Sequence, residues 1–237
     1  MENKLCGKTI IWNGDSICMG EKDRGNWATR IAEKNDMNYK NYGIGGGTIA
    51  EGLPMMKDGG KRHSVSETLD KMYEEYPDAD YIVLEGGTND ADLFESDYDY
   101  NNSKLGSIDP EDFSGEYDRN TFCGALESVF YRALKYWNGK KICFIVAQKM
   151  GVLVRSRRKR RLYFDKAVEI CKKWGIPYLD LWEGCYLNPA LPWMYNPEKT
   201  PKENSEENTC FYKDGQHLTS RGYDFTAEII DAWLKSL

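Results

Sequence analysis

The sequence predicts an α/β fold in which a parallel β-sheet lies between layers of helices. Short apolar runs, which are typical of buried strands, alternate with segments whose apolar residues recur every three or four positions, as on one face of a helix. A helix that connects two parallel strands packs back onto the sheet, so this alternation favours a sheet covered on both faces. The length of 237 residues fits one domain of this class.

Five segments carry the pattern of a strand. The run from Tyr81 to Leu84 is apolar throughout, which suits a central strand that helices cover on both faces. Turn residues close several of the runs, as Asn13 and Gly14 close the first. The five predicted strands are residues 9–12, 38–41, 81–84, 142–147 and 176–181.

Five segments between and after these strands have helical spacing. Ser66 is placed to cap the second helix, and Pro77 ends it. Gly175 and Pro177 end the fourth. The apolar stripes of the five predicted helices fall within residues 27–32, 69–76, 122–137, 164–174 and 223–237.

Two long polar segments interrupt the pattern. They cover about residues 91–120 and 183–213, and neither carries a clear strand or helix signal. No linker or internal repeat divides the chain, so we expect one domain over 1–237, with these segments as surface insertions. Long irregular segments of this kind are usually functional, and ligands of parallel α/β folds bind beyond the carboxyl ends of the strands. We therefore expect the insertions to shape a substrate site there.

The composition excludes several classes of function. The formal net charge of −6 argues against general binding to nucleic acid or to anionic lipid, which needs a basic surface. No stretch approaches eighteen uncharged apolar residues, and the start of the chain lacks the apolar region of a signal peptide. We expect a cytoplasmic protein with neither a membrane nor a nucleic acid as partner.

The cysteines and histidines give no metal or disulfide pattern. The seven cysteines are scattered and form no Cys-x-x-Cys pair, which favours reduced, mostly buried thiols. Only His63 and His217 are present, and neither has a cysteine pair at ligand spacing. No metal and no cofactor is therefore expected.

Ser16 is the candidate nucleophile. It follows the first predicted strand, after Gly14, a residue that lets the chain turn sharply. A serine hydroxyl attacks efficiently only when a base takes its proton. His217 is the candidate base, because Asp214 lies three residues before it and can hold the far ring nitrogen. His63 lies in a polar loop without an adjacent acid, so we expect a surface residue that could border the substrate cleft.

Acyl transfer also needs donors for the oxyanion that forms on the attacked carbonyl. The glycine-rich run 43–47 can bring a backbone N–H close to a substrate, and Asn89, after the third predicted strand, offers an amide donor. Each motif alone is common: a Gly-Asp-Ser tripeptide or an Asn after two glycines is mostly a turn, and an Asp-x-x-His is mostly a cap or a surface pair. Their order and their places at strand ends favour the catalytic interpretation.

These motifs resemble the four sequence blocks of the SGNH (GDSL-type) hydrolases. The first block is matched by Gly14-Asp15-Ser16-Ile17, and the second by residues 41–48, where Gly46 takes the place of the oxyanion-hole glycine. The third is matched by residues 86–90, and the last by residues 214–218. The four blocks occur in the family's order over nearly the whole chain.

The resemblance implies a three-layer α/β/α sandwich with a five-stranded parallel sheet of the flavodoxin-like kind. It implies Ser16 as nucleophile, His217 as base and Asp214 as the residue that orients it. It further implies an oxyanion hole made of the Ser16 and Gly46 backbone N–H groups and the Asn89 side chain. The second block departs from the family pattern at Gly45 and Gly47, where relatives often carry other residues.

Two further features bear on the substrate and on partners. The basic run from Arg155 to Arg161 follows the fourth predicted strand, which suggests a partner such as the acidic segment 90–99 or an anionic substrate. The second insertion is aromatic close to His217, and its rings either pack the loop down or form a platform for a sugar. These candidate substrate-binding residues are Trp193, Tyr195, Phe211 and Tyr212.

The sequence thus predicts a serine-dependent carboxylic ester hydrolase. We favour a small acyl group, such as acetyl, on a carbohydrate or other small ester, because no apolar lid helix is evident and polar, aromatic loops lie near the site. Two alternatives stay open. One is an acyltransferase that uses the same acyl-enzyme, and the other is a catalytically silent module that binds glycans. The sequence does not predict an oligomeric state.

Overall fold

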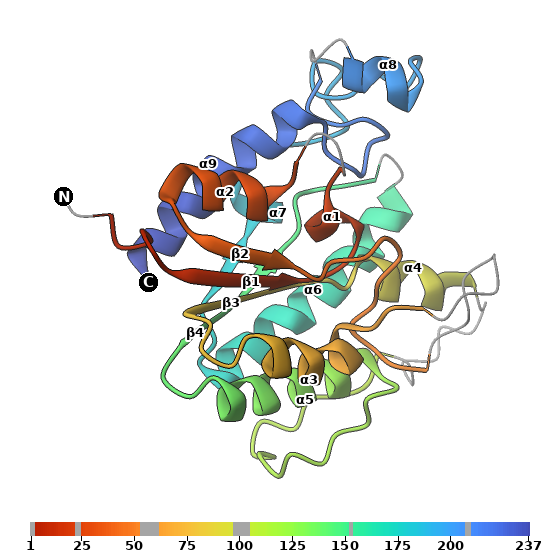
Figure 1. The fold of residues 1–237 in the computed structure, drawn as a ribbon. Helices are drawn as coiled ribbons and strands as arrows, with labels where there is room; N and C mark the ends of the chain where they lie inside the picture. The colour runs from red at the N-terminus through yellow and green to blue at the C-terminus, as the bar shows by residue number, and fades with distance from the viewer. Residues whose placement is uncertain (1–2, 22–24, 53–61, 97–104, 152–153, 207–209) are drawn as a thin grey trace.

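The computed structural model describes residues 3–21, 25–52, 62–96, 105–151, 154–206 and 210–237. At its centre is the predicted parallel sheet of five strands, and the strands lie in the order β2-β1-β3-β4-β5 (Figure 1). Ile11 of β1 pairs with Ile82 of β3, and Ile82 pairs with Ile142 of β4. The strands are β1 (Thr9–Asn13), β2 (Asn38–Asn41), β3 (Tyr81–Glu85), β4 (Lys141–Val146) and β5 (Tyr178–Asp180).

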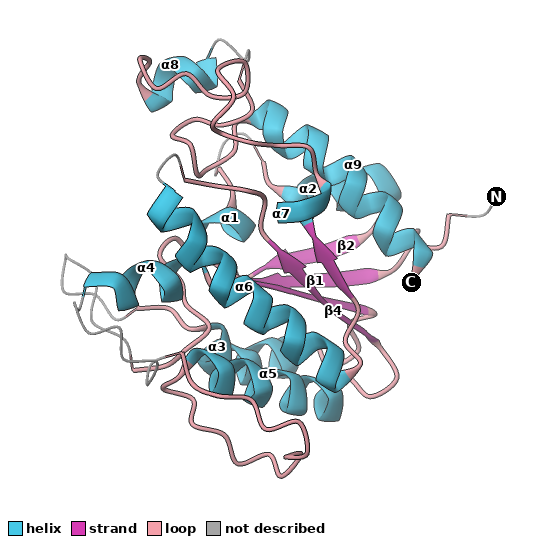
Figure 2. Ribbon diagram, turned by 180° about the vertical axis from the view of Figure 1, so that it is seen from behind, coloured by secondary structure: helices cyan, strands magenta, loops and turns pink. Residues whose placement is uncertain are grey.

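Helices cover both faces of the sheet. The helices are α1 (Ser16–Met19), α2 (Trp27–Asn35), α3 (Val65–Glu75), α4 (Thr88–Ser96), α5 (Phe122–Tyr136), α6 (Val154–Trp174), α7 (Leu181–Gly184), α8 (Pro201–Glu206) and α9 (Ser220–Ser236). On one face α2 packs against α9, and on the other α5 lies between α3 and α6 (Figures 1 and 2). This is the expected three-layer α/β/α sandwich.

The strands differ in burial as their places in the sheet require. All five residues of β3 are buried, which agrees with its central place. At one edge, β2 exposes Asn38, Tyr39 and Lys40. At the other edge, β5 has only three residues, because Asp180 caps α7 by accepting the Glu183 N–H. The predicted strand 176–181 is therefore too long.

The expected cap of α3 is wrong. The N-cap is Ser64, whose backbone is extended and whose hydroxyl accepts the Glu67 N–H. Ser64 and Glu67 have the spacing of a capping box. This signal lies before the apolar stripe from which the helix was predicted, so the stripe alone did not reveal it. Ser66 lies inside the helix, and its hydroxyl donates to the Glu51 carboxylate at 2.7 Å.

The first predicted insertion is partly regular. Its start belongs to α4, which extends to Ser96, and residues 97–104 lie outside the described part of the chain. Farther on, Phe113 and Tyr117 pack against Trp174, the last residue of α6. Because α6 begins after the carboxyl end of β4 and runs back along the sheet, this part lies far from the strand ends where a site was expected. The expectation that the whole insertion shapes that site is wrong.

The second insertion contains α7 and α8 at either end of an irregular stretch. All seven cysteines are free thiols, and all except Cys6 are buried. Within the described residues, no helix has the length and apolar character that a membrane span needs.

Candidate active site

The chain turns sharply between β1 and α1, over residues 13–16, which we call the Ser16 turn. Asp15 caps α1 by accepting the Ile17 N–H at 2.8 Å. Gly14 has no room for a side chain, because a Cβ there would lie 2.6 Å from Glu85 Oε2 and 2.7 Å from the Cys18 Cβ. The tight turn leaves Ser16 half-buried at the carboxyl end of β1.

The fold brings Ser16 and His217 together across 201 positions of sequence. Ser16 Oγ lies 2.9 Å from His217 Nε2, and His217 Nδ1 lies 2.7 Å from Asp214 Oδ2. The three side chains form one line of hydrogen bonds. A base in this place can take the serine proton, and the carboxylate can stabilise the imidazolium that results.

Residues 212–218, the His217 loop, hold Asp214 and His217 in register. Besides the ring, Asp214 accepts the His217 backbone N–H through Oδ1 at 2.7 Å. Lys213 and His217 also share a backbone hydrogen bond of 2.9 Å. Burial acts to raise the pKa of Asp214, but the hydrogen bonds and charge of His217 outweigh it and hold that pKa below its usual value. Asp214 is therefore a carboxylate at neutral pH.

Residues 43–47, the glycine loop, lie beside the Ser16 turn. The Ile44 N–H donates to the Gly14 carbonyl at 3.2 Å, and the Gly47 N–H donates to the Ile44 carbonyl at 2.9 Å. Gly46 has a φ of +76°, in the left-handed region where a side chain is strained. Asn89 connects the two segments: its Nδ2 donates to the Gly47 carbonyl at 2.8 Å and lies 3.4 Å from Asp15 Oδ2.

The three expected donors belong to segments that hydrogen bonds join at the strand ends. The Ser16 N–H is at the start of α1, where a helix leaves its first N–H groups without internal partners. Asn89 Nδ2 donates one hydrogen to the Gly47 carbonyl at 2.8 Å and the other to Asp15 Oδ2 at 3.4 Å, and the second, longer bond is the one that an oxyanion would replace. Among the described residues, neither Ser16 nor Gly46 uses its N–H in a backbone hydrogen bond. These groups can together stabilise an oxyanion.

A buried pair of carboxyl groups lies beneath Ser16, and the sequence did not predict it. Asp15 and Glu85 are both fully buried, and the Asp15 N–H donates to Glu85 Oε2 at 3.2 Å. Burial raises the pKa of both, and the Asp15 charge raises that of Glu85 further. We assign the proton of this pair to Glu85. A signal was present, because Glu85 is a charged residue at the end of an otherwise apolar strand.

A third buried carboxyl group positions the segment after the glycine loop. Asp90 accepts the Ile49 N–H at 3.0 Å and the Ala50 N–H at 2.9 Å. Burial raises the pKa of Asp90 to about 7, although both N–H groups act to lower it. Asp90 therefore links α4, which carries Asn89, to the residues that follow the glycine loop.

His63 is not the surface residue that its polar loop suggested. Its Nε2 lies 3.1 Å from Asn13 Oδ1, and its Nδ1 lies 3.3 Å from Thr68 Oγ1. The ring is half-buried under the glycine loop, where a Cβ on Gly47 would approach it to 3.0 Å. Burial lowers the pKa of His63, so its ring is neutral at neutral pH.

The four aromatic candidates of the second insertion differ in exposure. Tyr212 is fully buried, and its hydroxyl donates to the Lys149 carbonyl at 2.5 Å, so of the two alternatives its ring packs the loop down and is not part of a platform for a sugar. Phe211 is half-buried against Phe225 and Arg221. Tyr195 is also half-buried, whereas Trp193 is 65% exposed and stays the most accessible candidate.

Within the described part of the chain, no three His, Cys, Asp or Glu side chains form a group that could hold a metal ion. The line from Ser16 to Asp214 consists of a hydroxyl, an imidazole and a carboxylate.

Comparison with known families identifies the family of the chain. A family model described as "GDSL-like Lipase/Acylhydrolase family" matches residues 13–225, so the chain belongs to that family. The matched range includes the Ser16 turn, the glycine loop, Asn89 and the His217 loop. The prediction of an ester-hydrolysing enzyme is confirmed by this membership.

Solved structures share the fold over nearly the whole chain. A protein from Lactobacillus plantarum is 21% identical with a TM-score of 0.70, and 98% of each chain is covered. A lipase/acylhydrolase from Enterococcus faecalis is 17% identical with a TM-score of 0.56, covering 97% of this chain and 96% of that one. A carbohydrate acetylesterase from Sinorhizobium meliloti is 12% identical with a TM-score of 0.63, covering 97% and 99%. No curated protein matches the chain in sequence.

Proposed function

We propose that this enzyme hydrolyses carboxylic esters, with Ser16 as nucleophile, His217 as general base and Asp214 as the carboxylate that orients the imidazole. The observation that carries the proposal is the unbroken line of hydrogen bonds, 2.9 Å from Ser16 to His217 and 2.7 Å from His217 to Asp214. Asp214 fixes the tautomer in which Nε2 is the free acceptor, because it accepts a hydrogen from Nδ1.

The proposed reaction has two halves. Ser16 Oγ attacks the ester carbonyl while its proton moves to His217 Nε2, and the resulting oxyanion accepts hydrogen bonds from the Ser16 and Gly46 N–H groups and Asn89 Nδ2. When the carbon–oxygen bond to the alcohol breaks, the alcohol takes the proton from His217. Water then attacks the acyl-enzyme, His217 accepts the water proton, and the carboxylic acid leaves as Ser16 regains its hydrogen.

We further propose a small acyl group, such as acetyl, on a carbohydrate. The structural likeness to a carbohydrate acetylesterase supports this choice. The exposed Trp193 offers a flat apolar ring of the kind that stacks on sugars. In this proposal the chain acts as one domain over 1–237, and the insertion 183–213 forms one border of the substrate site.

Hydrolysis of 4-nitrophenyl acetate and 4-nitrophenyl octanoate tests these statements. We expect turnover of the acetyl ester by the wild type and none above background by Ser16→Ala. Ser114→Ala is the matched control, since Ser114 lies in the described part of the first insertion, among residues that pack at the far end of α6. Absence of wild-type turnover on both esters would exclude the hydrolase, activity of Ser16→Ala would exclude the assigned nucleophile, and a preference for octanoate would exclude the small acyl group.

The same assay separates hydrolysis from acyl transfer. If water is the natural acceptor, the yield of free acetate equals the yield of 4-nitrophenol even after a sugar is added as an alternative acceptor. A yield of acetylated sugar that exceeds free acetate would assign the enzyme to acyl transfer, with the same Ser16 intermediate.

A further inference from the structure

Among the residues of the basic run at the start of α6 whose side chains the structure describes, 158–161, Arg160 is the buried one. The sequence suggested that this run pairs with the acidic segment 90–99 or with an anionic substrate, and Arg160 confirms the first. Its Nε lies 3.0 Å from Asp92 Oδ1 and its Nη2 lies 2.6 Å from Asp92 Oδ2, so the guanidinium donates a bidentate pair of hydrogen bonds to the carboxylate. The Arg160 side chain is only 6% exposed. Burying an unpaired charge costs free energy, so a buried guanidinium needs partners that are held in place.

Arg160 also reaches the His217 loop. Its Nη2 donates to Gln216 Oε1 at 2.8 Å, and the Gln216 carbonyl accepts a second hydrogen bond of 3.0 Å from Gln148. Gln216 is the residue directly before His217. Asp92, the other partner of Arg160, lies three residues after Asn89 on α4, which places it on the same side of the helix one turn later.

We propose that Arg160 is a positioning residue, which fixes Asn89 and His217 relative to each other by holding Asp92 and Gln216 with one guanidinium group. The inference rests on the proposed function, because it concerns the distance between the base and an oxyanion donor. Asn89 and His217 belong to segments that are 128 positions apart in sequence, the difference between 217 and 89. Arg160 touches neither of them and contacts no reacting atom; it acts through its two partners.

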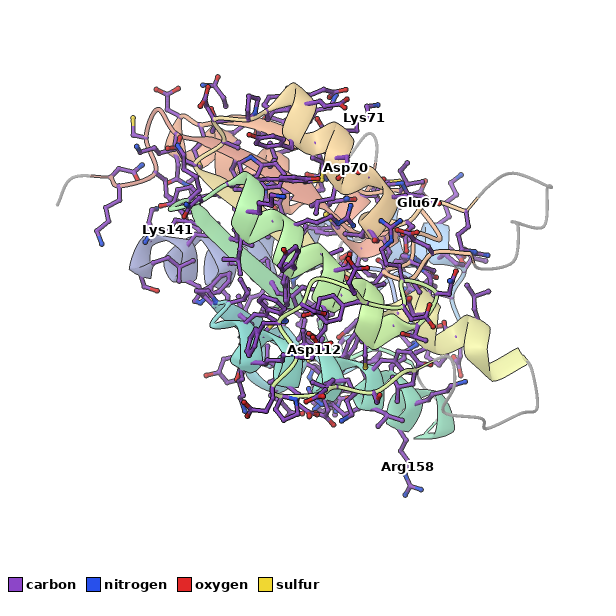
Figure 3. All side chains as sticks on the ribbon, turned by 90° about the horizontal axis from the view of Figure 1, so that it is seen from below. Glu67, Asp70, Lys71, Asp112, Lys141 and Arg158 are labelled. Carbon is purple, nitrogen blue, oxygen red and sulfur yellow. The ribbon has the colours of Figure 1, made fainter. Side chains whose placement is uncertain are left out.

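Neighbouring arginines of α6 provide matched controls. Arg158 is exposed and points away from the body of the protein (Figure 3). Arg161 is adjacent to Arg160 but pairs with Asp165 at 2.6 Å and with Asp180 at 2.9 Å, at the end of β5. Removal of either charge changes the helix in a similar way without touching Asp92 or Gln216.

The first experiment compares Arg160→Met, Arg158→Met and Arg161→Met with 4-nitrophenyl acetate as substrate. We expect Arg160→Met to lower kcat by about 10- to 100-fold, the cost of a misplaced catalytic group, with KM little changed. The two controls keep the wild-type kcat. A folded Arg160→Met enzyme with wild-type kcat would overturn the inference, and so would an equal loss in Arg161→Met.

Two milder variants keep the test valid if Arg160→Met does not fold. Gln216→Ala removes one contact of Arg160 at a half-buried site, and Arg160→Lys keeps the charge without the planar fork. We expect both to lower kcat by less than Arg160→Met. We expect the double variant Arg160→Met with Asp92→Asn to lower kcat by less than the product of the two single fold-losses, because both substitutions break the same ion pair. Independent losses would overturn the link.

Hydrogen exchange distinguishes failure of this inference from failure of the proposed function. The amides of residues 212–218 exchange faster in Arg160→Met than in Arg158→Met, whether or not the protein hydrolyses the ester. Unchanged exchange in that segment would overturn the positioning role even in an active enzyme.

Discussion

The Ser16 turn and the His217 loop meet at one hydrogen bond, yet they are held in different ways. Under the turn, Asp15 and Glu85 are fully buried, and Gly14 has no space for even one more carbon atom. In the loop, the side chains of Asp214 and His217 are 33% and 27% exposed. Ser16 therefore follows a fully packed turn, whereas Asp214 and His217 are held mainly by polar contacts on a more exposed part of their loop.

The anchors of the His217 loop come from several parts of the chain. Arg160 and Gln148 hold Gln216, and Lys213 forms an ion pair of 2.9 Å with Glu21, just after α1. Arg160 and Gln148 are themselves buried, whereas the side chains of Lys213 and Glu21 are partly exposed. An ion pair that water reaches contributes little on its own. The comparison indicates that the turn responds to changes of volume and buried charge, and the loop to loss of a polar partner.

The largest effect is expected where the two regions meet. His217→Gln removes the proposed base, and we expect it to lower kcat on the order of 10⁴-fold or more, as loss of the base does in other serine hydrolases. His63→Gln is the matched control, since His63 contacts Asn13 rather than Ser16. We expect its kcat to stay within a few-fold of wild type in the 4-nitrophenyl acetate assay. A large loss of kcat in His63→Gln with little loss in His217→Gln would instead identify His63 as the base.

An intermediate effect is expected beneath the Ser16 turn. Glu85→Ala removes the acceptor of the Asp15 N–H and leaves a cavity, which lowers the free energy of unfolding by about 2–4 kcal/mol. Glu85→Gln keeps a neutral acceptor of the same shape, and we expect it to cost about 1 kcal/mol or less, because burial and the Asp15 charge raise the pKa of Glu85 and favour its protonated form. Denaturant unfolding measures both. If the Gln variant is as unstable as the Ala variant, Glu85 is ionised in the folded protein.

The last expected effect is a difference in how the two regions respond to pH. The pKa of Asp90 is raised from 3.8 to about 7, so the folded state holds a proton that the unfolded state releases, and this lowers stability as pH rises through that window. The pKa of Asp214 is lowered, so its stabilising contribution is present above 3.8 and is lost as pH falls below that value.

Unfolding experiments between pH 4 and pH 7 test the Asp90 part of this difference. Asp90→Asn makes the decline of unfolding free energy with pH shallower in this window, because it removes that titration. Asp214→Asn leaves the decline as it is. The same slope in Asp90→Asn and wild type would show that Asp90 is ionised throughout.

The sequence predicted the features that depend on neighbours along the chain. The five strands, the Gly-Asp-Ser turn and the three-residue spacing of Asp214 and His217 are all local patterns, and the fold brings Ser16 and His217 to 2.9 Å. The roles of these residues stay proposals. The N-cap of α3 was also open to prediction from spacing, because Ser64 and Glu67 are three residues apart, as in a capping box. Ser66 was predicted instead.

What the sequence did not predict depends on contacts between distant segments. Glu85 lies 70 positions from Asp15, and only the pairing of β1 with β3 brings them together. Tyr212 is aromatic and close to His217 in sequence, but its hydroxyl finds a buried carbonyl 63 positions away. The burial of such a side chain depends on the packing of the whole fold, which a local pattern does not contain.

The edges of the sheet limit how the protein associates with itself. An open edge strand presents free N–H and C=O groups to any extended chain, and natural proteins block this route with short strands and charged residues. Here β2 carries Lys40 among its exposed polar residues, and β5 ends after three residues at a helix. Neither edge offers a long apolar template, so concentrated solutions of the folded enzyme should resist β-sheet aggregation.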